Sequence, residues 1–71
     1  MIPETVSKLL DLGLGLRISN SDEKGCARIM ASTPMKMSIR LEGIQQVYPN
    51  AVITKIEEEW GMGFYTVKLN D

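Results

Sequence analysis

The densest charge in the sequence is a run of three glutamates, Glu57, Glu58 and Glu59, followed directly by the only tryptophan, Trp60. On a β-strand, consecutive side chains alternate between the two faces, so at most two of these carboxylates can point together. No histidine or further acidic residue lies nearby in the sequence to complete a metal site or an acid–base pair. The run is therefore either a solvated strand end or an acidic patch that meets Lys and Arg on a partner.

Trp60 has two interpretations that the sequence alone leaves open. Its ring could fold back over the small core, because a chain of 71 residues has few large side chains to bury. Alternatively, it could stay exposed among the charges, which is typical of a binding hot spot.

Catalytic chemistry has little support in the rest of the sequence. The chain contains no histidine, which is the usual general base and neutral metal ligand. Cys26 therefore has no histidine to activate it, and we expect it to be an unreactive residue in a strand. Neither Gly13-Leu14-Gly15 nor Gly61-Met62-Gly63 extends into a nucleotide-binding motif. We expect a protein that is not an enzyme and that uses no cofactor or metal.

Length and charge restrict the architecture and the partners. A chain of 71 residues holds one domain, over residues 1–71. The net charge of −1 provides no basic surface for duplex nucleic acid. Residues 1–4 lack the basic segment of a signal peptide, and glycines and Asp11 interrupt the apolar stretch 9–16. We therefore expect no membrane segment and a cytoplasmic protein.

The first half of the chain is expected to form a helix and a hairpin. Pro3 suits the first position of a helix over about 3–12, which Gly13 would end. Apolar residues then alternate with polar or small ones from residue 14 to 18, and again over 26–31. The polar residues between these segments favour a turn, so the two strands should form a hairpin.

A second helix is predicted from Pro34 to about residue 47, with Thr33 as its N-cap. One stripe of this helix should cover the sheet, and it consists of Met37, Leu41, Ile44 and Tyr48, with Val47 at its edge. Met35 and Ile39 fall on the opposite face, one turn apart. They are either scattered surface residues or a contact surface for a second copy or another protein.

Two further strands, over 51–59 and 64–69, should form a second hairpin, with Gly61 and Gly63 in its connection. The expected fold is an α+β domain of order α-β-β-α-β-β, with a mostly antiparallel sheet and the second helix packed on one face. The order of the strands within the sheet stays open.

From Ala27 onward, the segment from Ile29-Met30-Ala31-Ser32 through an amphipathic helix to Tyr48-Pro49-Asn50-Ala51-Val52-Ile53-Thr54-Lys55-Ile56-Glu57 resembles small phage-encoded βαββ inhibitors. These include inhibitors of host RNA polymerase and some anti-CRISPR proteins. The resemblance covers about half of the chain and assigns no residue to a site. It implies a compact protein that acts by occupying the surface of a larger assembly.

Three functional hypotheses follow. The leading one is a non-enzymatic protein-binding domain, such as a phage inhibitor of a host protein, that meets a basic surface through Glu57, Glu58, Glu59, Trp60, Met35 and Ile39. The second is a structural homo-oligomer, for example a dimer, paired through the Met35 and Ile39 face or a sheet edge. The third, opposed by the acidic residues nearby, is a binder of single-stranded nucleic acid that uses Arg17, Lys24, Arg28 and Lys55, with Phe64 or Tyr65 for stacking.

Overall fold

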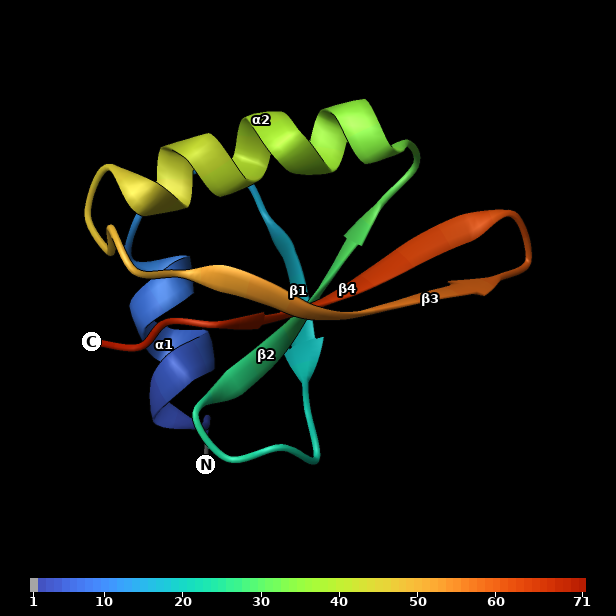
Figure 1. Cartoon of the computed structure of the whole chain (residues 1–71). Helices are drawn as coiled ribbons and strands as arrows, with labels where there is room; N and C mark the ends of the chain where they lie inside the picture. Colours follow the sequence, from blue (N-terminus) through green and yellow to red (C-terminus); the bar gives the residue numbers. More distant parts are fainter. Residues whose placement is uncertain (1) are drawn as a thin grey trace.

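The computed structural model describes residues 2–71 and has the element order predicted from the sequence (Figure 1). The six elements are α1 (Glu4–Leu10), β1 (Arg17–Asn20), β2 (Cys26–Ala31), α2 (Pro34–Gln45), β3 (Val52–Glu59) and β4 (Met62–Lys68). The four strands form one sheet in the order β1-β2-β4-β3, and each neighbouring pair is antiparallel. The predicted α+β class is confirmed.

Both helices lie on one face of the sheet. Val6 and Leu9 of α1 belong to the same buried cluster as Met37 and Ile44 of α2. The inward side chains of the central strands complete this cluster, and they include Ala27, Ile29, Ala31, Tyr65 and Val67. The molecule therefore has two layers, and neither helix covers the other face of the sheet, which we call the open face.

The start of α2 follows the predicted capping pattern. The hydroxyl oxygen of Thr33 accepts a hydrogen bond from the backbone N–H of Lys36 at 3.1 Å, and Pro34 occupies the first turn. An N-cap of this kind satisfies a backbone donor that the helix itself leaves free. Met37 and Ile44 are buried, whereas Leu41 and Tyr48 are partly buried, as the stripe predicted.

The first helix and first strand are shorter than expected. Pro3 is the N-cap of α1 rather than its first residue, and the helix ends at Leu10. Leu14 is not in β1, because Gly13 and Gly15 adopt positive φ angles of 66° and 67° that interrupt extended backbone. Leu14 lies against Gly43 of α2, where a β-carbon would approach the leucine side chain to 3.0 Å.

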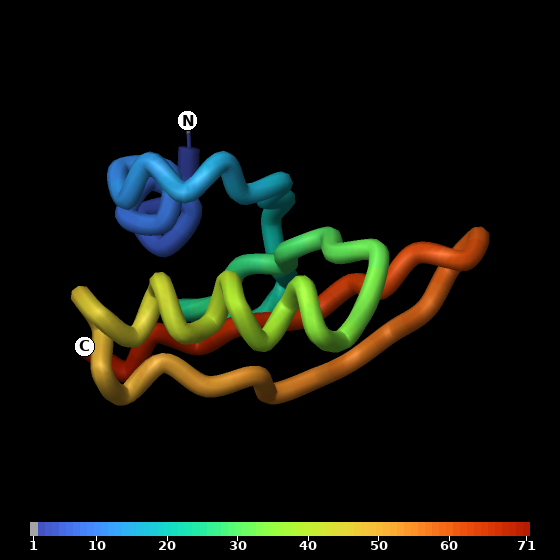
Figure 2. Tube along the Cα trace, turned by 90° about the horizontal axis from the view of Figure 1, so that it is seen from above, coloured from blue at the N-terminus to red at the C-terminus, as the bar shows by residue number. Residues whose placement is uncertain are grey.

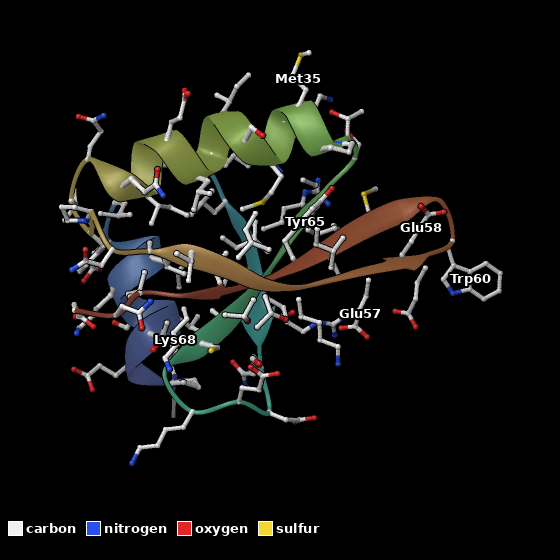
Figure 3. The ribbon with its side chains drawn as sticks, viewed as in Figure 1. Met35, Glu57, Glu58, Trp60, Tyr65 and Lys68 are labelled. Carbon is white, nitrogen blue, oxygen red and sulfur yellow. The ribbon has the colours of Figure 1, made fainter. Side chains whose placement is uncertain are left out.

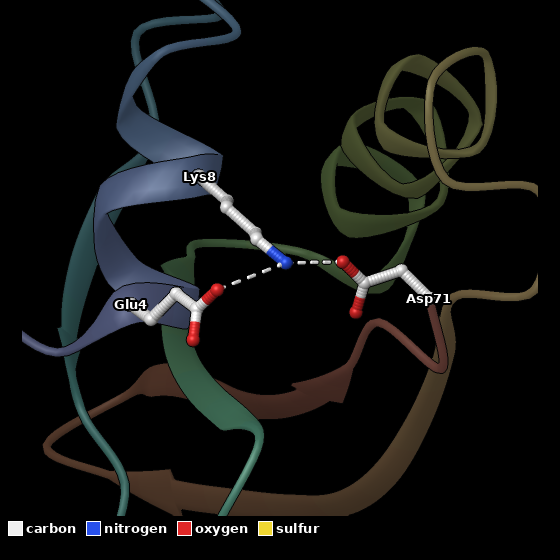
Figure 4. Close-up of polar contacts among 3 residues, drawn as sticks. All are labelled: Glu4, Lys8 and Asp71. Atoms are coloured by element: carbon white, nitrogen blue, oxygen red, sulfur yellow. Dashed lines mark hydrogen bonds and ion pairs between the residues drawn. The ribbon is translucent and has the colours of Figure 1, made fainter.

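An ion-pair group joins α1 to the end of the described chain (Figure 4). The ammonium group of Lys8 contacts Asp71, and it lies 3.4 Å from a carboxylate oxygen of Glu4. Because Asp71 follows β4, this group holds α1 near the end of the last strand.

The hairpin formed by β3 and β4 is the longest feature of the sheet. It extends past the N-terminal end of α2, so neither helix packs against its turn (Figure 2). The connection is shorter than predicted, since β4 begins at Met62 and includes Gly63. The turn is therefore formed by Trp60 and Gly61 alone.

Candidate functional site

Trp60 occupies a backbone position that suits other residues better. Glu59 pairs with Met62, which leaves a two-residue turn, and both residues of this turn have positive φ angles of 56° and 74°. Turns with two positive φ angles are the type I′ turns of tight hairpins, and they favour Asn-Gly or Asp-Gly. For a bulky residue such as tryptophan, the left-handed conformation costs about 1 kcal/mol or more.

Burial of the Trp60 side chain does not offset this conformational cost. It is fully exposed and points beyond the end of the hairpin (Figure 3). The possibility that the ring covers the core is therefore excluded. An indole of this size loses contact with water only when something outside residues 2–71 of this chain covers it.

The three glutamates divide between the two faces of the hairpin, as the strand alternation predicted. Glu57 lies on the open face, 3.8 Å from a guanidinium nitrogen of Arg28 and 3.9 Å from the ammonium group of Lys55. Glu59 shares that face by strand alternation, whereas Glu58 lies on the α2 side (Figure 3). Among the ion pairs of residues 2–71, neither Glu58 nor Glu59 takes part.

The hairpin tip therefore combines an exposed indole with two exposed carboxylates that make no ion pair among residues 2–71. We use the name "hairpin tip" for Glu58, Glu59 and Trp60. Glu57, which the sequence grouped with them, is half-buried in an ion-pair group of the open face and is less available to a partner.

Met35 and Ile39 lie on the outer face of α2, with exposed fractions of 75% and 62%. Met35 points away from the sheet, while Trp60 points past the end of the hairpin (Figure 3). The structure thus separates the six candidate residues, with Met35 and Ile39 on the outer face of α2 and the three glutamates and Trp60 on the β3–β4 hairpin.

The open face carries most of the basic residues considered for nucleic acid. Arg17, Arg28, Lys55 and Phe64 all lie there by strand alternation, and the guanidinium carbon of Arg28 lies 4.7 Å from the centre of the Phe64 ring. Lys24 is separate, in the exposed loop before β2. The Nε of Arg28 is buried, and no atom of residues 2–71 accepts its proton.

One stacking residue proposed from the sequence is wrong. Tyr65 is buried on the helical side of the sheet, since it lies one residue after Phe64 and strand side chains alternate. Its ring also lies over Gly63, where a β-carbon would be 2.8 Å from the tyrosine ring. Tyr65 is therefore part of the core and cannot stack on a nucleobase.

The surroundings of Cys26 disfavour thiol reactivity, as the sequence predicted. It is buried, and its sulfur lies 3.8 Å from a carboxylate oxygen of Glu23. Burial raises the pKa of the Cys26 thiol, and the negative charge of Glu23 raises it further. Both effects disfavour the thiolate, which is the reactive form.

No metal-binding group was found among residues 2–71, where His, Cys, Asp and Glu side chains do not gather in threes in a suitable arrangement. A surface hollow of about 380 Å³ lies between the start of α1 and the loop before β2. It is lined by Glu4, Asp22 and Glu23 among others, and it is separate from the hairpin tip.

Neither helix of the described chain is long and apolar enough to cross a membrane. Comparison with known proteins finds no matching family model, no matching curated protein and no matching solved structure, so the likeness to small phage inhibitors stays a hypothesis.

Proposed function

We propose that this protein is a non-enzymatic binding domain that places its hairpin tip on a basic surface of a partner protein. Trp60 is the observation that carries the proposal. A fully exposed tryptophan at a left-handed turn position stabilises nothing within the described fold, and its backbone conformation is unfavourable. Strained positions of this kind are concentrated at functional sites, and tryptophan is among the residues most enriched in binding hot spots.

The two free carboxylates determine which partner surface suits the tip. Glu58 and Glu59 flank Trp60 on opposite faces of the hairpin, so negative charge lies on both sides of the indole. Complementary charge steers association and suppresses unsuitable partners, while burial of the aromatic ring supplies affinity. A concave, basic surface that accepts the indole would satisfy both requirements. By occluding such a surface, the domain would act as an inhibitor, for example a phage inhibitor of a host protein in the cytoplasm.

The experiment is affinity capture from a cell lysate with two baits, the native protein and W60N. Asparagine suits the turn, so the variant keeps the hairpin and removes only the ring. We expect the native bait to retain one protein in an amount close to that of the bait itself. W60N should retain at least about tenfold less of that protein, as expected for a hot spot. V47S serves as the control, because Val47 is also an exposed apolar residue and lies just after the C-terminal end of α2, whereas the hairpin extends past the N-terminal end of that helix.

Equal capture by native and W60N baits would contradict the proposal. Loss of the partner from V47S as well would show that any exposed apolar residue matters, and this would contradict a site at the tip.

A second candidate function is a homodimer formed through the outer face of α2. The specific observation is that Met35 and Ile39 are both exposed, one helical turn apart. Leu14 extends this apolar surface, since it lies against Gly43 on the next turn and is itself 42% exposed. Light scattering of the native protein and I39E tests it, since a homodimer of this kind should dissociate in the variant.

A further inference from the structure

The outer edge of β3 is the second feature of the hairpin that has no partner within the structure. β3 is the last strand of the sheet and bonds to β4 on one side only. Its distal half projects beyond α2, so no helix covers it there (Figure 2). An edge strand presents a row of free N–H and C=O groups that can pair with another extended chain.

The register indicates which backbone groups of β3 are available. In a two-residue hairpin, the residues that flank the turn form a hydrogen-bonded pair, here Glu59 and Met62. Because N–H directions alternate along a strand, the N–H groups of Glu58 and Ile56 point away from β4. The pairing is regular from Lys55 to Glu59, since the only irregularity lies between Ile53 and Lys55.

This edge lacks most of the features by which proteins block strand addition. It is eight residues long, whereas the opposite edge strand, β1, has four. It contains no proline, and the side chain of Ile56 is 67% exposed on the α2 side. Short strands, prolines and bulges normally protect edges, and here only the bulge near Thr54 and the charges remain.

The charges of β3 decide between a second copy and a different chain. Residues 55–59 carry three glutamates and one lysine. Pairing with a second copy would bring two such strands together, and like charges on neighbouring strands are destabilising. A strand with lysine or arginine at alternate positions would instead place its cations beside Glu59 on one face, or beside Glu58 on the other.

We infer that the partner contributes an extended basic segment that adds to the edge of β3 as a fifth strand. Backbone hydrogen bonds to Ile56 and Glu58 supply affinity, the glutamates select cationic side chains, and Trp60 covers the end of the added strand next to the turn. Recognition of this kind derives affinity from main-chain bonds and specificity from alternate side chains. The mode of binding rests on the proposed function, because it assigns a partner class to the same hairpin.

The experiment uses the full chain and a peptide of about eight residues with alternating lysine and valine, a length typical of a strand. A peptide with glutamate in place of lysine is its control. Amide chemical shifts and hydrogen exchange are followed residue by residue. We expect the lysine peptide to slow exchange of the Ile56 and Glu58 amides by about tenfold or more and to bind at least tenfold more tightly than the glutamate peptide.

A charge-reversal variant tests whether the site lies on β3. E58K/E59K changes two exposed side chains that make no ion pair in the described chain, so the fold should be kept. The variant should bind the glutamate peptide more tightly than the lysine peptide. Failure of the lysine peptide to bind the native chain, or binding that protects other amides and leaves Ile56 and Glu58 unchanged, would overturn strand addition.

Failure of strand addition can be told apart from failure of the proposed role of the hairpin tip. If W60N loses the captured protein and the peptide does not bind, strand addition alone is wrong. If the peptide binds at Ile56 and Glu58 and W60N keeps the captured protein, the role of Trp60 is wrong and the edge remains the site.

Discussion

At the scale of single residues, the most informative conflict is between Trp60 and its own backbone. The left-handed conformation at φ 56° disfavours tryptophan, and the exposed ring makes no compensating contact within the described chain. Residues with such conflicts are often those that act on something outside the fold.

Replacing Trp60 should therefore make the protein more stable. W60N places Asn-Gly in the turn, the pair that type I′ turns prefer, and we expect the free energy of unfolding to rise by about 1 kcal/mol. Urea unfolding followed by circular dichroism measures this change. W60G, which also relaxes the backbone, should show a smaller gain because glycine is more flexible when unfolded. A clear loss of stability in W60N would mean that the indole supports the fold.

The contact between Lys8 and Asp71 should make stability depend on pH. The hydrogen bond from Lys8 and its charge lower the pKa of Asp71 below the ordinary value of 3.8, and the same contact raises the pKa of Lys8 above 10.5. The stabilisation is therefore present between these values, and it fades as pH falls through the lowered pKa of Asp71. Both groups are solvent-exposed, so the effect is small.

Thermal unfolding of the native protein and D71N checks this dependence. The native protein should melt slightly higher at pH 7, and the difference should fade as the pH falls through the lowered pKa of Asp71. A difference that persists unchanged into strong acid would show that the carboxylate charge is not involved.

At the scale of elements, patterns with a local cause were predictable. Thr33 and Pro34 mark the start of α2, and the period of the helix identifies Met37 and Ile44 as its buried residues. Element boundaries that depend on contacts between residues far apart in the sequence were not predictable. Nothing near Leu14 in the sequence indicates that it packs on Gly43 instead of extending β1.

The length of the connection between β3 and β4 was likewise not predictable from the sequence. Two glycines, Gly61 and Gly63, both suggested a turn, but only Gly61 is in it. Gly63 lies in β4 because the ring of Tyr65 occupies the space where a side chain would be, and this contact between residues two apart on one face is visible only in the structure. The exposure of Trp60 follows from the resulting short turn, so the sequence left its role open.

Gly63 should accordingly resist substitution. In G63A the new methyl group would be 2.8 Å from the ring of Tyr65 and 3.1 Å from the carbonyl oxygen of Ala31. Because Tyr65 is buried and cannot move freely, we expect a loss of about 1–3 kcal/mol, which is typical of overpacking. Chemical denaturation measures it. The double variant G63A/Y65L, which removes the ring, should recover part of the loss if the clash is its cause.

At the scale of the whole molecule, the two-layer arrangement leaves three surfaces without a covering element. They are the hairpin tip with the β3 edge, the outer face of α2, and the open face of the sheet. On the open face Arg28 stacks on Phe64 and lies near Glu57, although its buried Nε has no acceptor among residues 2–71. The hairpin differs from it, since its indole, two carboxylates and edge amides all lack partners in the described chain.

The outer face of α2 gives a prediction about oligomeric state. If Met35 and Ile39 bind a second copy, light scattering at increasing concentration should show a dimer that I39E converts to a monomer. S38E, which adds the same charge to a neighbouring exposed position of α2, is the control and should leave the dimer intact. A native monomer at all concentrations would exclude the homodimer and leave the heterologous partner.

The environment of Trp60 in the presence of other proteins tests the central claim most directly. Because the chain has one tryptophan, biosynthetic labelling with 5-fluorotryptophan gives one ¹⁹F signal that reports on this residue alone. The account predicts a sharp, solvent-exposed signal in buffer that shifts or broadens in lysate from the cells where the protein acts. Excess unlabelled native protein should restore the sharp signal, and excess W60N should not. A signal that stays sharp in a lysate from which the native protein captures a partner would contradict a binding role for Trp60.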